Sequence, residues 1–293
     1  MRGEEIAYVT EDFEIPTFVN IERYPDGSPM VKHWPDFQPT RVLLRPRDSA
    51  GFLGGLFWVQ ALNERNFERH RGPELIIPCL FGQRQDRINQ DGDCLFTAKS
   101  VAKLINSLEL PRVTVLDPHS DVSHSLIDRC RVVGVDDIWA YHFGEEAGDY
   151  EAVVAPDAGA VKRATKIANL LKLPLKLGSK KRDTATGKLT GFGVESMLDV
   201  KDKHLPDHPG YEPKVLVIDD LCDGGGTFIG LHDELEREGV RADLFVTHGL
   251  FTKGTKDLVN RFERVICTDS VAALRPDVEV LYTANTLLTD GDL

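Results

Sequence analysis

The stretch from Val215 to Phe228 constrains the fold of this chain more than any other. It begins with an apolar run that is typical of a buried strand, passes two adjacent aspartates, and reaches three glycines and a threonine before a helical pattern starts. A strand, a glycine-rich turn and a helix N-terminus form an anion cradle, because small residues let backbone N–H groups approach a phosphate and the helix dipole favours its charge. The stretch therefore predicts a phosphate-binding turn.

Three carboxylates accompany this turn and indicate a second kind of ligand. Asp219 and Asp220 stand at the end of the strand, and Asp223 opens the turn. Carboxylates do not bind phosphate, but they accept hydrogen bonds from sugar hydroxyls and can hold a metal. A phosphate beside a diol indicates a ribose phosphate; the alternative is a tight turn with a solvated aspartate cluster. The candidate ribose phosphate site consists of Asp219, Asp220, Asp223, Gly224, Gly225, Gly226 and Thr227.

Strand-like apolar runs alternate with helical patterns along the chain. Such alternation predicts an α/β fold, here with two similar doubly wound parallel-sheet domains that cover residues 1–142 and 143–293. Residues 1–50 carry many prolines and are expected to be irregular, with short strands at 17–21 and 41–44. Residues 178–193 are rich in Gly, Lys and Thr and are expected to form a mobile polar loop.

Composition excludes some classes of function. The chain has 293 residues, a net charge of −12 and five scattered cysteines. The negative charge argues against a general nucleic-acid binder and against binding to anionic membranes. No apolar run approaches the roughly 20 residues of a membrane span, and the N-terminus lacks the apolar core of a signal peptide. The odd number of cysteines and the absence of metal-ligand spacing lead us to expect reduced thiols in a cytoplasmic protein.

Four further stretches, in register with the glycine turn, resemble the ribose-phosphate diphosphokinase family. The turn itself resembles the phosphoribosyl diphosphate motif of type I phosphoribosyltransferase folds, with Gly224 where that family has Thr. The order and approximate spacing agree with the family over residues 20 to 290. The four stretches are Phe81–Arg87 followed by Thr97-Ala98-Lys99, Asp117-Pro118-His119, Pro156–Gly159 followed by Lys162-Arg163-Ala164, and Thr247–Phe251.

The resemblance implies the family's reaction, in which the β,γ-diphosphoryl group of ATP moves to the C1 hydroxyl of ribose 5-phosphate to give phosphoribosyl diphosphate and AMP. It also implies Mg²⁺ as cofactor, a homo-oligomer (dimer or hexamer), ATP binding in the first domain and ribose 5-phosphate binding in the second. Matched residue by residue, the catalytic groups are Lys180, Arg182 and His119, and the metal ligands are His119 and Asp157. The ATP-binding residues are Tyr24, Asp26, Ser28, Arg84, Gln85 and Asp86.

Two alternatives to this reaction stay open. A phosphoribosyltransferase would share the glycine turn, although it would not need the Arg84-Gln85-Asp86 stretch or a second α/β half. A non-catalytic relative of the diphosphokinase would keep the fold without turnover. Three departures from the family pattern favour it: Gly224, Ser28 in place of a carboxylate, and a region of only about 20 residues before the turn at Tyr24.

Overall fold

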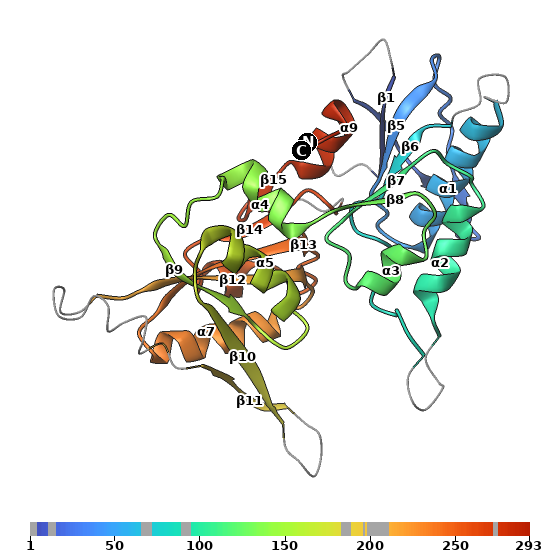
Figure 1. Cartoon of the computed structure of the whole chain (residues 1–293). Helices are drawn as coiled ribbons and strands as arrows, with labels where there is room; N and C mark the ends of the chain where they lie inside the picture. The colour runs from blue at the N-terminus through green and yellow to red at the C-terminus, as the bar shows by residue number, and fades with distance from the viewer. Residues whose placement is uncertain are drawn as a thin grey trace. The chain divides into compact units, whose positions relative to one another are not determined.

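The computed structural model describes residues 5–10, 16–65, 72–88, 95–182, 189–195, 197, 211–271 and 275–293. The chain divides into two compact units, each built around its own sheet (Figure 1). The first unit comprises residues 1–134, 269–274 and 282–293, and the second comprises residues 135–268 and 275–281. Parallel strands connected through helices form most of both sheets, which confirms the predicted α/β class.

The first unit contains a six-stranded sheet in the order β2-β1-β5-β6-β7-β8. Strands β5 to β8 run parallel, whereas β1 pairs antiparallel with both β2 and β5. A separate hairpin of β3 and β4 carries the turn at residues 24–28. The strands are β1 (Ile6–Thr10), β2 (Thr17–Val19), β3 (Glu22–Arg23), β4 (Pro29–Met30), β5 (Pro39–Leu44), β6 (Glu74–Ile76), β7 (Val113–Leu116) and β8 (Cys130–Val133).

Helices cover both faces of this first sheet. On one face, α1 (Ser49–Arg65) and α2 (Thr97–Asn106) bury Phe52, Leu56 and Ile105 against strand residues such as Val42. Short α3 (Asp121–Ser125) follows β7. On the side away from α1, α9 (Thr283–Asp290) packs against β1, β5 and β6 (Figure 1). The last helix of the chain therefore completes the core of the first unit.

The second unit contains a seven-stranded sheet in the order β11-β10-β9-β12-β13-β14-β15, parallel except for the β10–β11 pair. The strands are β9 (Tyr150–Ala155), β10 (Leu175–Arg182), β11 (Leu189–Val194), β12 (Lys214–Cys222), β13 (Arg241–Gly249), β14 (Val265–Thr268) and β15 (Glu279–Leu281). The helices are α4 (Val135–Phe143), α5 (Val161–Leu171), α7 (Gly226–Arg237) and α8 (Lys256–Val259).

Strand β12 lies in the middle of the second sheet and is buried on both faces. Val215 and Val217 pack in one core cluster with Phe228, Leu231 and Leu235 of α7. The alternate strand residues Leu216 and Ile218 point to the opposite face, which α5 covers, since successive side chains of a strand point to opposite sides. A strand that is covered on both faces has a near-continuous run of apolar residues. The sequence shows this pattern directly before Asp219.

Three features differ from the sequence expectations. First, residues 6–10 are not irregular but form a fully buried strand, because their apolar side chains fill the core beside β5. Second, residues 178–182 and 189–193, expected within a polar loop, belong to strands, because Gly178–Arg182 of β10 pairs antiparallel with Leu189–Val194 of β11. Residues 183–188 lie outside the described part of the chain.

The third difference concerns the boundary between the units. The prediction ended the first domain at residue 142 and kept the whole C-terminal region in the second, whereas the compact units divide at Gly134 and Val135 and residues 282–293 return to the first unit. Asp269 explains the return. Its carboxylate accepts backbone N–H bonds from Ala284 (2.7 Å) and Asn285 (3.1 Å), and Arg45 donates to its carbonyl at 3.0 Å. Among the described helices, none is long and apolar enough to cross a membrane.

Candidate functional site

The turn between β12 and α7 has the geometry of an anion cradle. Gly225 lies in the left-handed region, with φ of 76°, and α7 begins at the next residue. No side chain caps this helix, so its first backbone N–H groups are available to a ligand. A Cβ atom at Gly226 would meet nothing within 4 Å, which leaves open space beside the turn. The predicted strand, glycine turn and helix are therefore all present at the positions expected.

The loop after β13 forms a second wall of this turn. The N–H groups of Leu250 and Phe251 donate to the Cys222 carbonyl at 2.9 and 3.0 Å, and the Thr252 hydroxyl donates to the Asp223 carboxylate at 2.5 Å. Lys253 follows on the same loop, and a Cβ atom at Gly224 would lie 3.2 Å from its Cδ atom. The fold thus brings a lysine to the phosphate turn, a residue that the sequence analysis did not select.

The two aspartates at the end of β12 share one buried guanidinium. Arg163 of α5 lies 3.1 Å from Asp220 and 3.5 Å from Asp219, measured from Nη1 to Oδ1. Burial and the neighbouring Asp220 charge raise the pKa of Asp219 to about 8, although Arg163 acts in the opposite direction. Because the arginine does not fully offset burial and the repulsion between the two carboxyl groups, a ligand hydroxyl that donates here would stabilise their charged forms. Arg163 belongs to a motif noted in the sequence, but only the fold reveals its partners.

Asp157 joins these carboxylates at the same edge of the sheet. Strands β9 and β12 are parallel neighbours in which Val154 pairs with Val217, so Asp157 and Asp220 each lie three residues beyond that pair. Asp157 is half-buried, and its carboxylate accepts the Gly159 N–H at 2.9 Å. Several carboxylate oxygens at one sheet edge form the hard donor set that Mg²⁺ prefers.

Within the first unit, the predicted ATP segment meets the predicted metal histidine. The Gln83 side chain accepts the backbone N–H of His119 at 2.9 Å. Asp86 is buried, and despite that burial the Ser120 hydroxyl, Arg87 and His119 hold its pKa below the ordinary value. Asp86 therefore ties its loop to the end of β7.

Arg84 and Gln85 differ from Asp86 because both are exposed. Gln85 is held by Thr97 at the start of α2, whose hydroxyl contacts its side-chain oxygen. The loop thus presents an exposed arginine and an exposed amide, the latter held by Thr97.

The predicted adenine turn is a tight hairpin. Asp26 accepts hydrogen bonds from the Ser28 N–H (2.9 Å) and hydroxyl (2.6 Å), and these bonds lower its pKa. Gly27 takes the positive φ of 85° that the turn needs. The ring of Tyr24 is about half exposed. Ser28, which stands where the family has a carboxylate, thus helps to close the turn.

Lys180 and Arg182, the predicted catalytic cations, lie on β10, where their backbones pair with Phe192 and Leu189 of β11. Their side chains are not among the described parts of the structure. The two cations therefore stand at the end of a hairpin stem next to residues 183–188, and not within an irregular loop.

Comparisons with known proteins agree with this geometry. A phosphoribosyl transferase domain model matches residues 131–275. The ribose-phosphate pyrophosphokinase of Thermococcus kodakarensis is 28% identical over 257 residues, which cover 83% of this chain and 81% of the relative. The enzyme of the same name from Maricaulis maris is 29% identical and covers 87% of this chain and 80% of the relative.

One solved structure shares the fold over most of the chain. The phosphoribosylpyrophosphate synthetase from Mycobacterium smegmatis superposes with a TM-score of 0.72 at 23% identity, covering 94% of this chain and 89% of that chain. The fold class, the sequence motifs and the curated relatives thus point in one direction. The chain has a type I phosphoribosyltransferase fold and is similar to the ribose-phosphate pyrophosphokinases over most of its length.

Proposed function

We propose that this protein is a ribose-phosphate diphosphokinase, which transfers the diphosphoryl group of ATP to the C1 hydroxyl of ribose 5-phosphate. The observation that carries the proposal is the pairing of an uncapped glycine turn with two aspartates that share one arginine. The turn suits the 5-phosphate, and the aspartates suit the sugar hydroxyls. Curated relatives with this named activity cover more than four-fifths of the chain.

The residues of the second unit would hold and orient the acceptor sugar. The backbone N–H groups at the start of α7 would bind the 5-phosphate, and Lys253 would add a charge beside Gly224. Asp219 and Asp220 would accept hydrogen bonds from the ribose hydroxyls, while Arg163 fixes both carboxylates from behind. Holding the sugar at two points would direct its C1 hydroxyl toward the donor, which is how positioning lowers a transfer barrier.

The residues of the first unit would hold ATP. Arg84 is exposed and can meet a triphosphate, while Gln85 and His119 are fixed by their contacts with Thr97 and Gln83. His119 and Asp157 would hold Mg²⁺, Asp157 as an oxygen ligand and His119 through a water molecule, because Mg²⁺ prefers oxygen ligands and keeps several waters. Mg²⁺ would supply neutralisation of phosphate charge. Lys180 and Arg182 would add positive charge to the moving diphosphoryl group, since such transfers depend mainly on positioning and charge.

A phosphoribosyltransferase is the weaker alternative. Such an enzyme would use the glycine turn, but its reaction would not need the contacts among Gln83, Asp86 and His119 in the first unit. A cytoplasmic location and a homo-oligomer, dimer or hexamer, belong to the same proposal. Sedimentation with and without ATP would determine the assembly.

The decisive assay measures AMP. Incubation with ATP, ribose 5-phosphate and Mg²⁺ is expected to release AMP together with phosphoribosyl diphosphate in equal amounts. Omission of the sugar should abolish AMP formation, and other nucleoside triphosphates in parallel would reveal the donor preference. Absence of AMP at saturating Mg²⁺ would favour a non-catalytic relative, and consumption of phosphoribosyl diphosphate with a base would favour a phosphoribosyltransferase.

Single substitutions then test the cations. Lys180→Ala and Arg182→Ala are each expected to lower kcat by about 10²-fold or more, because each removes charge from the transition state. The melting temperature should change little, since both residues lie on an edge hairpin. A variant that keeps a near-normal kcat would remove that residue from the mechanism.

A further inference from the structure

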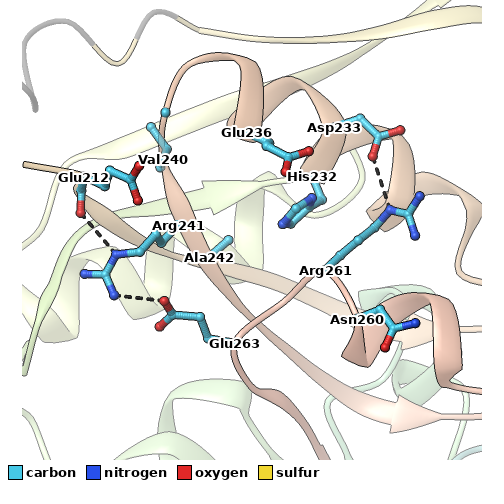
Figure 2. A pocket seen from close by; sticks show the side chains of 11 residues that line it. Glu212, His232, Asp233, Glu236, Val240, Arg241, Ala242, Asn260, Arg261 and Glu263 are labelled. Carbon is cyan, nitrogen blue, oxygen red and sulfur yellow. Dashed lines mark hydrogen bonds and ion pairs between the residues drawn. The ribbon is translucent and has the colours of Figure 1, made fainter. Parts of the chain in front are cut away.

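A second cluster of polar residues lies at the other end of α7. A pocket of about 460 Å³ opens between the second half of this helix and the start of β13 (Figure 2). Arg241 and Ala242 of its lining begin β13, so the pocket is at the amino edge of the sheet. The phosphate turn is at the carboxyl edge, at the N-terminus of the same helix. The two sites therefore share a helix but not a surface.

His232 is the most constrained residue in this pocket. Its side chain is only 7% exposed. The ring of Phe262 packs edge-on against it at 5.0 Å. The Nδ1 atom is buried and has no hydrogen-bond partner among the described residues. A buried ring nitrogen without a hydrogen-bond partner is costly, and a metal ion bound to its lone pair would remove that cost.

Two carboxylates complete the cluster. Asp233 and Glu236 lie on the same helix, and one ligand atom from each falls with one of His232 within 4.8 Å of one another. Glu236 is four residues after His232, the spacing that places two side chains on one face of a helix. Figure 2 shows Glu236 beside the imidazole and Asp233 turned toward Arg261, whose Nε lies 3.2 Å from the Asp233 carboxylate.

The charge of the pocket favours a cation. Its lining carries four carboxylates, Glu212, Asp233, Glu236 and Glu263, against the two guanidinium groups of Arg241 and Arg261. Both arginines already pair with carboxylates, Arg241 with Glu263 at 2.8 Å and Arg261 with Asp233. The last turns of α7 also carry the negative end of the helix dipole, which a bound cation would stabilise. An anion would be repelled by the same carboxylates and by the same end of the helix dipole.

We propose that His232, Asp233 and Glu236 form a binding site for a transition-metal dication, with Zn²⁺ as the preferred ion. One imidazole nitrogen and two carboxylate oxygens are ligands that Zn²⁺ accepts at about 2.0–2.2 Å, with water in the remaining position. The hard ion Mg²⁺ binds nitrogen poorly, so this site is distinct in preference from the proposed magnesium ligands.

The test measures Zn²⁺ binding to the full chain by isothermal titration calorimetry, with excess Mg²⁺ present to saturate oxygen-only sites. Glu236→Gln keeps the size of an exposed side chain and is expected to weaken the binding at least about tenfold. His232→Gln should weaken it further, with circular dichroism to verify folding. The matched control is Glu234→Gln, two residues away on the same helix, which pairs with Arg237 and is expected to leave binding unchanged.

The outcomes separate clearly. A high-affinity Zn²⁺ site that Glu236→Gln weakens and Glu234→Gln does not would support the assignment. Equal Zn²⁺ binding in wild type and Glu236→Gln, or binding of inorganic phosphate lost in Arg241→Gln, would overturn it. Neither result depends on catalytic activity, so a failure here would leave the proposed function untouched.

Discussion

Both edges of the second sheet bury aspartate side chains, but the two sets differ in how well other groups of the protein compensate their charge. At the amino edge, Asp243 is fully buried and accepts hydrogen bonds from the Tyr150 hydroxyl at 2.6 Å and the Arg264 N–H at 3.0 Å. Lys214 adds an ion pair at 3.1 Å. At the carboxyl edge, Asp219 and Asp220 share Arg163, and the pKa of Asp219 is raised to about 8.

The comparison distinguishes a structural network from a site prepared for a ligand. Burial opposes the charge of Lys214, but hydrogen bonds to Asp243 and Glu263 outweigh it and raise the pKa of this lysine. The charges around Asp243 are thus matched within the protein. At the carboxyl edge burial and the Asp220 charge outweigh Arg163 and raise the pKa of Asp219, so a sugar hydroxyl that donates there would stabilise the charged form. Buried acids that stay poorly compensated are candidates for function.

The largest expected effect is a loss of stability when the ion pair between Lys214 and Asp243 at the amino edge is removed. Lys214→Met should lower the free energy of unfolding by about 3–5 kcal/mol, because it leaves Asp243 buried with less compensation. Urea denaturation measures the change, while kcat/KM of the folded fraction should stay close to that of wild type. The control is Arg241→Gln, which breaks an exposed pair with Glu263 and should cost less than about 1 kcal/mol. A loss as small as that of the control would contradict a structural role for Lys214.

The second effect concerns affinity at the carboxyl edge. Asp220→Asn should weaken ribose 5-phosphate binding by about 10–100-fold, equivalent to roughly 1.4–2.8 kcal/mol. Stability should not fall, because the change removes a charge from a crowded pair. Calorimetric titration with the sugar phosphate gives the affinity, and ATP binding provides the internal control. Unchanged sugar affinity would remove Asp220 from the site.

A pH-dependent effect on stability comes third. Because the folded pKa of Asp219 is raised from 3.8 to about 8, the folded protein holds a proton that the unfolded chain has released between those values. Stability contributed by this group is therefore present at low pH and is lost as pH rises through the window. Asp219→Asn removes this titrating group. The difference in free energy of unfolding between the variant and wild type should therefore be more favourable to the variant at pH 8 than at pH 5, by on the order of 1–2 kcal/mol. Melting curves at both pH values test this, and parallel curves for the two proteins would refute the raised pKa.

The smallest effect tests the departure at Gly224. A Cβ there would meet only the Lys253 methylenes, at 3.2–3.5 Å, so a larger residue fits if that flexible side chain moves slightly. Gly224→Thr should lower the KM for ribose 5-phosphate by less than about tenfold, as expected for one added hydrogen bond. Gly224→Ala, which adds the bulk without the hydroxyl, should not improve it. A gain in both variants would point to backbone stiffening instead.

Elements with strong local signals were predictable from the sequence. The apolar run before Asp219 predicts β12, and the glycines after Asp223 predict the turn, because both depend on residues within one short segment. The short strands expected at 17–21 and 41–44 also appear, as β2 and within β5. The short strand β1 was not predicted, since proline-rich surroundings obscured five buried residues.

Contacts between distant segments were beyond prediction. Arg163 meets Asp219 across 56 residues of sequence, and Lys253 reaches Gly224 only because the loop after β13 folds back on Cys222. The return of α9 to the first unit depends on Asp269. Its partners are Arg45, 224 residues earlier in the chain, and Ala284, 15 residues later. Local patterns identify elements, whereas these partners emerge only when the sheet order is known.

A crystal structure with ribose 5-phosphate bound would test the central claim most directly, because it locates the ligand atoms themselves. We expect the ribose hydroxyls within hydrogen-bond distance of Asp219 or Asp220 and the phosphate on the backbone N–H groups of residues 224–227. A sugar phosphate bound elsewhere, with no contact to either carboxylate, would contradict our account of the carboxyl edge.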